Sequence, residues 1–488
     1  MAKNAQALEV SRWNGWRLEN PRTLLQPALV AAVFALGWAI WNMPPLQGMS
    51  AKANHFLATM VVAVAFWMFD VLEDYIVGLM LLLAWVVFGI VPAKVALAGF
   101  SENSWFFIIG SFGIAAAIGK TSLLQRLALG LLRWIPIRYQ KTCIAVLLGT
   151  GAFSTPLLPS GKARAAVTVP ISHAIADSAG FAPRSNGTAA IALSVFVGFT
   201  QMQFMFLTGG EQNLISWNLL PPSAKAEFGW LTWFLAAFPA ALCISISTFL
   251  SVHFLLPLSN QEKESLSKKP VPHLDTETGF ISRKDWIALT TLILTIFGWL
   301  TSALHGVSET WIAVIALLVF LVTGVLDKQG FRNDLDWGLI LFFGVLNSLS
   351  SIAEHLKIDA WLTAISASFL DRFAADPSRF LFMTFVLVLL VRFFLRKASA
   401  AALITITLVP LSDRVGIHPG VLIVTALMSG ECFLLAYQDG PYQIAYAGGG
   451  GPAFSHGQAR KILAAKYLAT LLAIAVSVPY WKFLGFIR

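Results

Sequence analysis

The sequence has few charged residues: Asp, Glu, Lys and Arg make up only 12% of its 488 residues. A soluble protein carries about 25% charged residues, whereas here hydrophobic residues reach 57% and the mean hydropathy is +0.72. This composition excludes a soluble domain and indicates a polytopic membrane protein. The net charge of +9 does not predict nucleic-acid binding, because the basic residues are dispersed in short loops.

The sequence also has few cysteines, with three in 488 residues. Cys143, Cys243 and Cys432 lie far apart in apolar runs, so they predict neither a disulfide framework nor a metal site. The sequence also lacks a catalytic constellation and a cofactor fingerprint, and we therefore expect a protein that is not an enzyme and needs no cofactor. The polar, basic segment 1–22 does not have the pattern of a cleavable signal peptide.

Long apolar runs recur along the whole chain. A crossing needs about 20 apolar residues, and the runs predict an all-α polytopic membrane protein with about 11 transmembrane helices. Two further stretches, 123–134 and 358–373, are amphipathic and are expected to lie along the membrane interface. The apolar runs are 27–43, 56–91 (two spans joined by an acidic turn), 100–118, 189–207, 228–258, 286–304, 310–326, 337–353, 380–395, 400–411, 420–437 and 462–485.

The runs divide the chain into two halves with the same order of elements. The predicted parts are a cytoplasmic N-terminal segment (1–22), a first transmembrane helix and loop (23–55), a first repeat (56–258), a cytoplasmic linker (259–284) and a second repeat (285–488). Each half has an odd number of segments, so we expect inverted repeats, as in secondary transporters whose site lies at the midplane. Basic short loops place the N-terminus in the cytoplasm and, by parity, the C-terminus outside.

The stretch 155–171 breaks an apolar segment of the first half. We predict that its flanks, 141–158 and 165–178, form a re-entrant hairpin, because irregular backbone at membrane depth is tolerated only beside a cavity or inside protein. The tip carries Ser160, Gly161, Lys162 and Arg164, which we predict to bind an anionic substrate. Free N–H groups where the second limb begins, together with the charge of Lys162, suit a carboxylate. The alternative is a cytoplasmic loop between two ordinary spans.

The stretch 395–411 repeats this design in the second half. By parity it enters from the outside, where few basic residues are expected. A cation at membrane depth is costly and therefore indicates function, unless its side chain extends to the surface. The residues of interest are Arg396, Lys397 and Ser399, which follow Arg392.

Polar, glycine-rich interruptions break the span that follows each hairpin. Glycine lets the backbone unwind, and each interruption carries one acid and groups able to bind an anion. Glu431 lies earlier in the second of these spans and is a candidate proton carrier or partner of Lys397. The alternative is that both interruptions are the solvent ends of ordinary spans. The first contains Thr208, Gly209, Glu211, Gln212 and Asn213, and the second contains Asp439, Gly440 and Pro441.

This arrangement resembles the divalent anion/sodium symporter family over nearly the whole chain. The family frame, a hairpin tip followed by small residues and an apolar residue before proline, is matched by 160–171 and, with one extra residue, by 399–410. The resemblance implies two inverted repeats, each with a re-entrant hairpin and a broken helix. It also implies a small anionic substrate, a coupling ion such as sodium, and a homodimer in the lipid bilayer.

The chain departs from the family at both tips. Family members have Ser-Asn-Thr there, which helps to hold sodium ions and the substrate carboxylates, whereas this chain has a lysine, Lys162 or Lys397, near each tip. We predict that the two lysines take over the electrostatic role of sodium. Glu211 and Asp439 are expected to neutralise them when the site is empty.

The sequence thus predicts a permease of the inner (cytoplasmic) membrane that moves small anions by alternating access. Dicarboxylates come first, because two opposed cationic tips suit two carboxylates, and the missing sodium motifs favour proton coupling or exchange. The open alternatives are a sodium-coupled anion symporter, a carrier of sulfate, sulfonates or tricarboxylates, a cation/proton antiporter and, in another class, a non-transporting membrane sensor.

Overall fold

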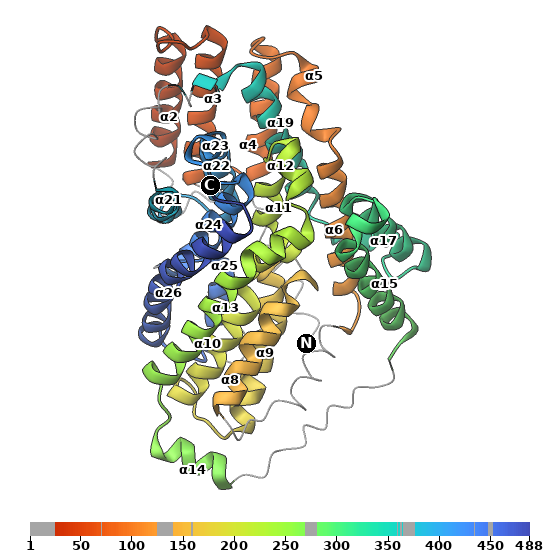
Figure 1. The fold of residues 1–488 in the computed structure, drawn as a ribbon, viewed down its shortest axis with the longest axis vertical. Helices are drawn as coiled ribbons and strands as arrows, with labels where there is room; N and C mark the ends of the chain where they lie inside the picture. The colour runs from red at the N-terminus through yellow and green to blue at the C-terminus, as the bar shows by residue number, and fades with distance from the viewer. Residues whose placement is uncertain are drawn as a thin grey trace.

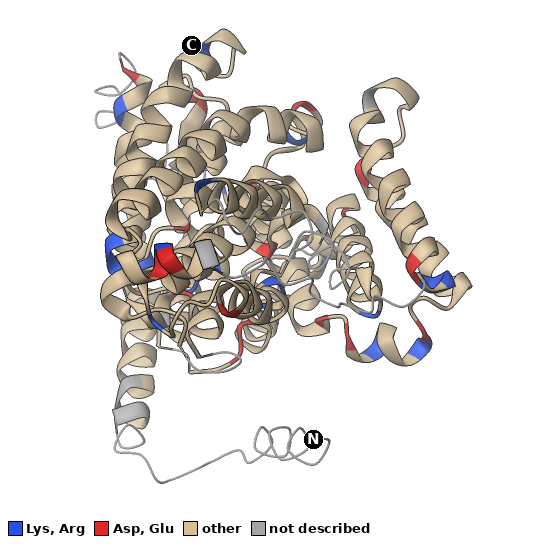
Figure 2. Cartoon of the chain, turned by 90° about the horizontal axis from the view of Figure 1, so that it is seen from below, with Lys and Arg blue, Asp and Glu red and all other residues tan. Residues whose placement is uncertain are grey.

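The computed structural model describes residues 25–488 except 70, 124–139, 158–159, 269–280, 359, 362–363, 365–375, 434 and 448–451. The described residues form helices, with one isolated β-bridge between Ile417 and Ile487. Figure 2 shows Lys, Arg, Asp and Glu as scattered positions along helices that consist mostly of other residues. The prediction of an all-α polytopic membrane protein is confirmed. The expected interfacial helices at 123–134 and 358–373 lie almost entirely outside the described residues.

Among the described residues, five helices are long and apolar enough to cross a membrane: Asn186–Met205, Trp230–Leu255, Trp337–His355, Lys397–Val415 and His456–Phe483. Several shorter apolar helices accompany them, including Asp74–Val87 and Glu309–Thr323. The first of the five is completely buried inside the protein, which places the broken helix of the first half at the centre of the molecule.

One group of helices contains α2 and the helices from the start of each half. α6 packs along α17, α4 along α19 and α2 along α3. Small residues allow these close approaches: a Cβ on Gly110 would lie 2.8 Å from the Cβ of Ala313. The members are α2 (Leu25–Asn42), α3 (Ala51–Met68), α4 (Asp74–Val87), α5 (Ala93–Ala96), η3 (Ala98–Phe100), α6 (Asn103–Gly119), α15 (Arg283–Leu300), α16 (Ser302–His305), α17 (Glu309–Thr323), α18 (Lys328–Asn333) and α19 (Trp337–His355).

The second group holds a hairpin, a broken helix and a long final helix from each half. In Figure 1, α8 and α9 lie below the centre of the view, and α22 and α23 lie above it. The long helices α13 and α26 pack along each other. The first half contributes α8 (Gln140–Ser154), η4 (Thr155–Leu157), α9 (Gly161–Ser178), α10 (Asn186–Thr200), η5 (Gln203–Met205), η6 (Leu207–Gly209), α11 (Glu211–Asn218), α12 (Pro222–Glu227) and α13 (Trp230–Leu255). The second half contributes α21 (Pro377–Arg392), α22 (Lys397–Leu408), η7 (Val409–Leu411), α23 (Ser412–Val415), α24 (Pro419–Gly430), η8 (Ala436–Gln438), α25 (Gly440–Ala447) and α26 (His456–Phe483).

The sequence between α8 and α9 explains why the first hairpin turns there. Pro156 lies in the short helix η4 that follows α8, and a proline there lacks the N–H that would continue the α-helical hydrogen bonds. Ser160 then starts α9, because its side-chain oxygen accepts a hydrogen bond from the Ala163 amide at 3.3 Å. The second limb therefore begins at Gly161 rather than at the expected residue 165, so Lys162 and Arg164 belong to the start of the helix.

The linker between the halves begins with a helix, α14 (Asn260–Lys268). Its buried Glu262 accepts hydrogen bonds from the backbone amides of Gly187 and Ser259, both at 2.7 Å. Burial raises the pKa of Glu262, but hydrogen bonds from Ser185, Ser259 and Gly187 outweigh it and hold the pKa below its usual range. The linker thereby anchors the start of α10, the first half of the central broken helix.

Candidate functional site

The starts of four helices in the second group meet at the centre of the protein. α9 packs against α25, and α11 packs against α22, so each hairpin contacts the broken helix of the other half. A Cβ on Gly161 would lie 3.2 Å from Pro441, which shows how closely the starts of α9 and α25 approach. Helix starts present free N–H groups and the positive end of the helix dipole, so their convergence favours an anion.

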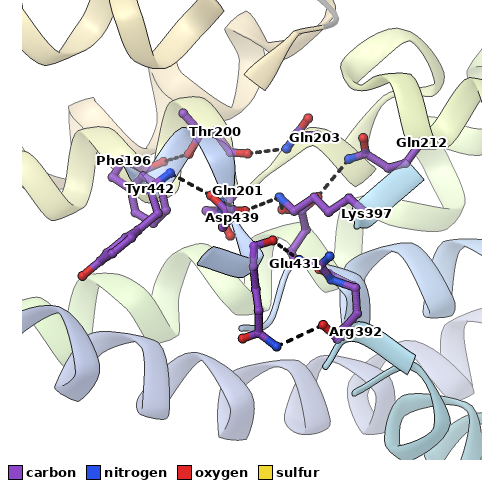
Figure 3. Close-up of polar contacts among 12 residues, drawn as sticks. Phe196, Thr200, Gln201, Gln203, Gln212, Arg392, Lys397, Glu431, Asp439 and Tyr442 are labelled. Atoms are coloured by element: carbon purple, nitrogen blue, oxygen red, sulfur yellow. Dashed lines mark hydrogen bonds and ion pairs between the residues drawn. The ribbon is translucent and has the colours of Figure 1, made fainter. Parts of the chain in front are cut away.

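Lys397 lies among these helix starts and is paired with two acids. Its Nζ atom lies 2.7 Å from Oε2 of Glu431 and 2.6 Å from Oδ2 of Asp439 (Figure 3). Glu431 directly follows α24, and Asp439 directly precedes α25. The Lys397 side chain is 13% exposed, and each acid at most 1%. The three charged groups form a buried cluster with one positive and two negative charges.

Residues from both halves complete the hydrogen bonds of this cluster. Gln212 Nε2 donates to Glu431 Oε1 at 3.0 Å, and Gln201 Nε2 donates to Asp439 Oδ2 at 3.3 Å (Figure 3). Lys466, on α26, donates from Nζ to Gln201 Oε1 and to the backbone oxygen of Glu431, both at 2.8 Å. The acids of the second half are therefore held by amide groups that reach across from the first.

The other predicted site residues fall into two environments. Lys162 is exposed and lies beside Gly440, where a Cβ would come within 2.7 Å of its Cε. Glu211, the first residue of α11, is half-buried, and within the described chain it forms no ion pair with Lys162. Arg396 is exposed and precedes α22, whereas Ser399 is buried in the first turn of that helix.

Several predicted residues hold the backbone in place. Asn213 Nδ2 donates to the backbone oxygens of Gln203 (2.7 Å) and Phe206 (2.8 Å), which fixes the unwound segment between α10 and α11. Thr208 is buried and accepts a hydrogen bond from Trp230 Nε1 at 3.2 Å. Gly209 has no room for a side chain, because a Cβ there would collide with the Gln203 carbonyl.

Sequence reasoning missed Gln201 and Lys466. Lys466 lies within the apolar helix α26 and is 2% exposed. A lysine inside an apolar span is a signal of function, and this signal was available. Gln201 lies directly after α10, where the helix breaks, and a polar residue at that place is a weaker signal. Among the described residues, no group of His, Cys, Asp and Glu is arranged to hold a metal ion.

The sequence is similar to a known family of membrane transporters and to several of its members. Residues 25–487 match the family described as "Sodium:sulfate symporter transmembrane region". The inner membrane protein YbhI of Escherichia coli (strain K12) is 22% identical over 376 residues, or 75% of each chain. The chloroplastic dicarboxylate transporter 2.2 of Arabidopsis thaliana is 25% identical over 426 residues, which are 83% of this chain and 75% of that protein.

A solved structure supports the fold. The YdaH transporter of Alcanivorax borkumensis, described as having an unusual topology, superimposes with a TM-score of 0.55 over 95% of this chain and 99% of that one. The sequences are 14% identical, so this likeness concerns the fold alone.

Proposed function

The chain belongs to the sodium:sulfate symporter transmembrane family, and on this basis we propose that it moves small anions across the cytoplasmic membrane by alternating access. Dicarboxylates are the proposed substrates. Proton coupling or exchange, rather than sodium, is the proposed driving force.

The pairing of Lys397 with Glu431 and Asp439 carries this proposal. The ammonium group of Lys397 can bind anions, and in this structure the carboxylates of Glu431 and Asp439 occupy it. A substrate carboxylate can replace one of the two acids on Lys397 without adding net charge around the lysine. The nearby starts of α9, α11 and α22 favour that exchange, because they stabilise negative charge.

Glu431 is the acid that we expect to leave Lys397 when substrate binds. Among the described residues, its carboxylate has two side-chain donors, Lys397 and Gln212. Asp439 has three donors, since it also accepts the Tyr442 amide at 2.8 Å. A cavity of about 20 Å³ lined by Gln212, Lys397 and Glu431 has room for about one water molecule. A carboxylate therefore fits beside Lys397 only after Glu431 moves.

The displaced Glu431 explains how transport is coupled. It leaves a buried carboxylate without its cation, which is costly. The cost is avoided if Glu431 takes up a proton when it leaves Lys397, and this route gives proton-coupled uptake. If Glu431 stays ionised and its pairing with Lys397 holds the empty carrier in place, only the loaded carrier moves, and this route gives exchange.

Lys162 is proposed to hold the second carboxylate of the substrate. Its exposed side chain lies in the first turn of α9 beside Gly440, so it is accessible to a ligand. A cavity of about 790 Å³ between the two groups of helices is proposed as part of the passage. Its walls include Glu102 and Thr310 from one group and Lys225 and Thr405 from the other. We further propose a homodimer with a cytoplasmic N-terminus.

Uptake of labelled succinate into proteoliposomes tests this function. Three drives are applied separately: an inward sodium gradient, an inward proton gradient, and unlabelled dicarboxylate inside the vesicles. We expect uptake with the proton gradient or with internal dicarboxylate, and none with sodium alone. Sodium-driven uptake would contradict sodium independence. If no uptake occurs under any of the three drives, dicarboxylates are not the substrates, and sulfate, sulfonates and tricarboxylates should be tested next.

A further inference from the structure

Arg164 joins two parts of the first half through backbone carbonyl groups. Its side chain is buried, with 2% of the residue exposed. Nε donates to the Phe199 oxygen at 2.6 Å, and Nη1 donates to the Thr155 oxygen at 3.0 Å. Phe199 lies at the end of α10, and Thr155 begins the hairpin turn. The guanidinium therefore connects the hairpin tip to the first part of the broken helix.

Arg392 makes the same connection in the second half. This residue is also 2% exposed. Nε donates to the Gly430 oxygen at 3.2 Å and Nη1 to the Leu395 oxygen at 3.0 Å, while Nη2 donates to the Gln438 oxygen at 2.6 Å. Gly430 ends α24, and Leu395 lies in the turn between α21 and α22 (Figure 3 shows Arg392 below Lys397).

The two arginines reach this geometry from different places in the sequence. Arg164 follows the hairpin turn, whereas Arg392 precedes it. In both halves Nε contacts the end of the broken helix and Nη1 contacts the turn. A copied repeat would place the arginines at matching positions. The shared geometry therefore points to a requirement for a cation at this place in each half.

A cation is needed here because the carbonyl groups at the end of each helix lack hydrogen-bond partners within that helix. The last carbonyls of a helix lack partners within the helix and carry the negative end of its dipole. In transporters with broken helices, such carbonyls coordinate the coupling cation. Here each set of carbonyls already binds a guanidinium. A sodium ion would have to displace those hydrogen bonds and lie beside a buried positive charge, so these residues do not fit a sodium site.

We propose that Arg164 and Arg392 are tethered cations that hold each hairpin tip against its broken helix, where a dissociable cation would otherwise be needed. This proposal changes the prediction that Lys162 and Lys397 take over the electrostatic role of sodium. The two arginines take that role instead, and the two lysines remain available to bind the substrate. This inference rests on one part of the proposed function, namely that transport does not require sodium. Removing either arginine should expose a carbonyl-lined site for a small cation.

Thermal unfolding of the full-length purified protein tests this inference. The variants are Arg164→Ala and Arg392→Ala, with Arg332→Ala as the control because Arg332 is exposed on α18. Each is melted in choline chloride, in sodium chloride and with millimolar guanidinium. We expect the arginine variants to melt lower than the wild type in choline and to recover by about 2–4 °C with sodium or guanidinium. The wild type and Arg332→Ala should not respond.

Lysine variants keep the test decisive if the alanine variants do not fold. Arg164→Lys and Arg392→Lys retain the charge but lose the two-pronged donor geometry, so they should fold and respond more weakly to guanidinium. Sodium stabilisation of the wild type, or variants that ignore every cation, would overturn the inference. Because melting needs no substrate, cation rescue without succinate uptake would refute the proposed substrate and leave the tethered cations standing.

Discussion

The Nζ atom of Lys397 lies 2.6 Å from Oδ2 of Asp439, so the starts of α22 and α25 are joined by a buried ion pair. Two helix starts brought together would repel through their dipoles. Asp439 relieves that repulsion, because its carboxylate also accepts the Tyr442 amide in the first turn of α25. The pair therefore stabilises the centre of the protein as well as the proposed site.

Replacing Lys397 by methionine should damage both stability and transport. The change keeps the apolar part of the side chain and leaves Glu431 and Asp439 buried without their cation, which we expect to cost about 3 kcal/mol or more. Succinate uptake should fall below detection. The measurements are thermal unfolding and proteoliposome uptake. The control is Lys461→Met, since Lys461 is exposed on α26. A Lys397→Met protein that transports like the wild type would refute the proposed site.

Replacing Glu431 by glutamine should separate proton coupling from exchange. The amide keeps one oxygen for Lys397 or Gln212 but cannot carry a proton between the two sides. We expect proton-driven uptake to fall by about tenfold or more, equivalent to about 1.4 kcal/mol, while exchange continues. Asp439→Asn should impair both activities, because Asp439 also binds the Tyr442 amide. Equal loss of both activities in Glu431→Gln would exclude Glu431 as the proton carrier.

The charged cluster shows what sequence could and could not predict. Lys397 and Glu431 were both predicted as site residues, with Glu431 as a candidate proton carrier or partner of Lys397, because charged groups at membrane depth indicate function. Lys466 was missed, since it follows the polar start of α26 and resembles the flank of a span. The hydrogen bond between Gln201 and Asp439 joins residues 238 positions apart, so no local sequence pattern predicts it.

The arginine contacts lay beyond sequence analysis for another reason. Arg164 was predicted to bind substrate on the strength of its charge and its place in a break. Its observed partners, the oxygens of Phe199 and Thr155, are backbone atoms that every residue possesses. The hairpins and broken helices were predictable from proline, glycine and charge. The carbonyl that each guanidinium meets is decided only by packing.

Cysteine labelling should place Lys162 in the substrate site. A Lys162→Cys variant is made with Cys243→Ser, because Cys143 and Cys432 are buried and Cys243 is only partly so. We expect succinate to slow maleimide labelling severalfold at position 162, and to have no effect on the exposed control Lys461→Cys. Lys162→Ala should fold normally and lose most uptake. Labelling that ignores succinate, or full uptake by Lys162→Ala, would remove Lys162 from the site.

Two glycines of α8 should respond oppositely to alanine. A Cβ on Gly151 would collide with the backbone of Gly198 in α10, whereas a Cβ on Gly149 meets nothing within 4 Å. Gly151→Ala must push α8 away from the broken helix, and we expect a loss of about 1–3 kcal/mol. Gly149→Ala should leave stability unchanged or raise it by about 0.4–1 kcal/mol, because alanine restricts the unfolded chain. Thermal unfolding of the two variants measures the difference. Equal stability would show that α8 does not pack against α10 through Gly151, and the contact that positions the first hairpin would have to lie elsewhere.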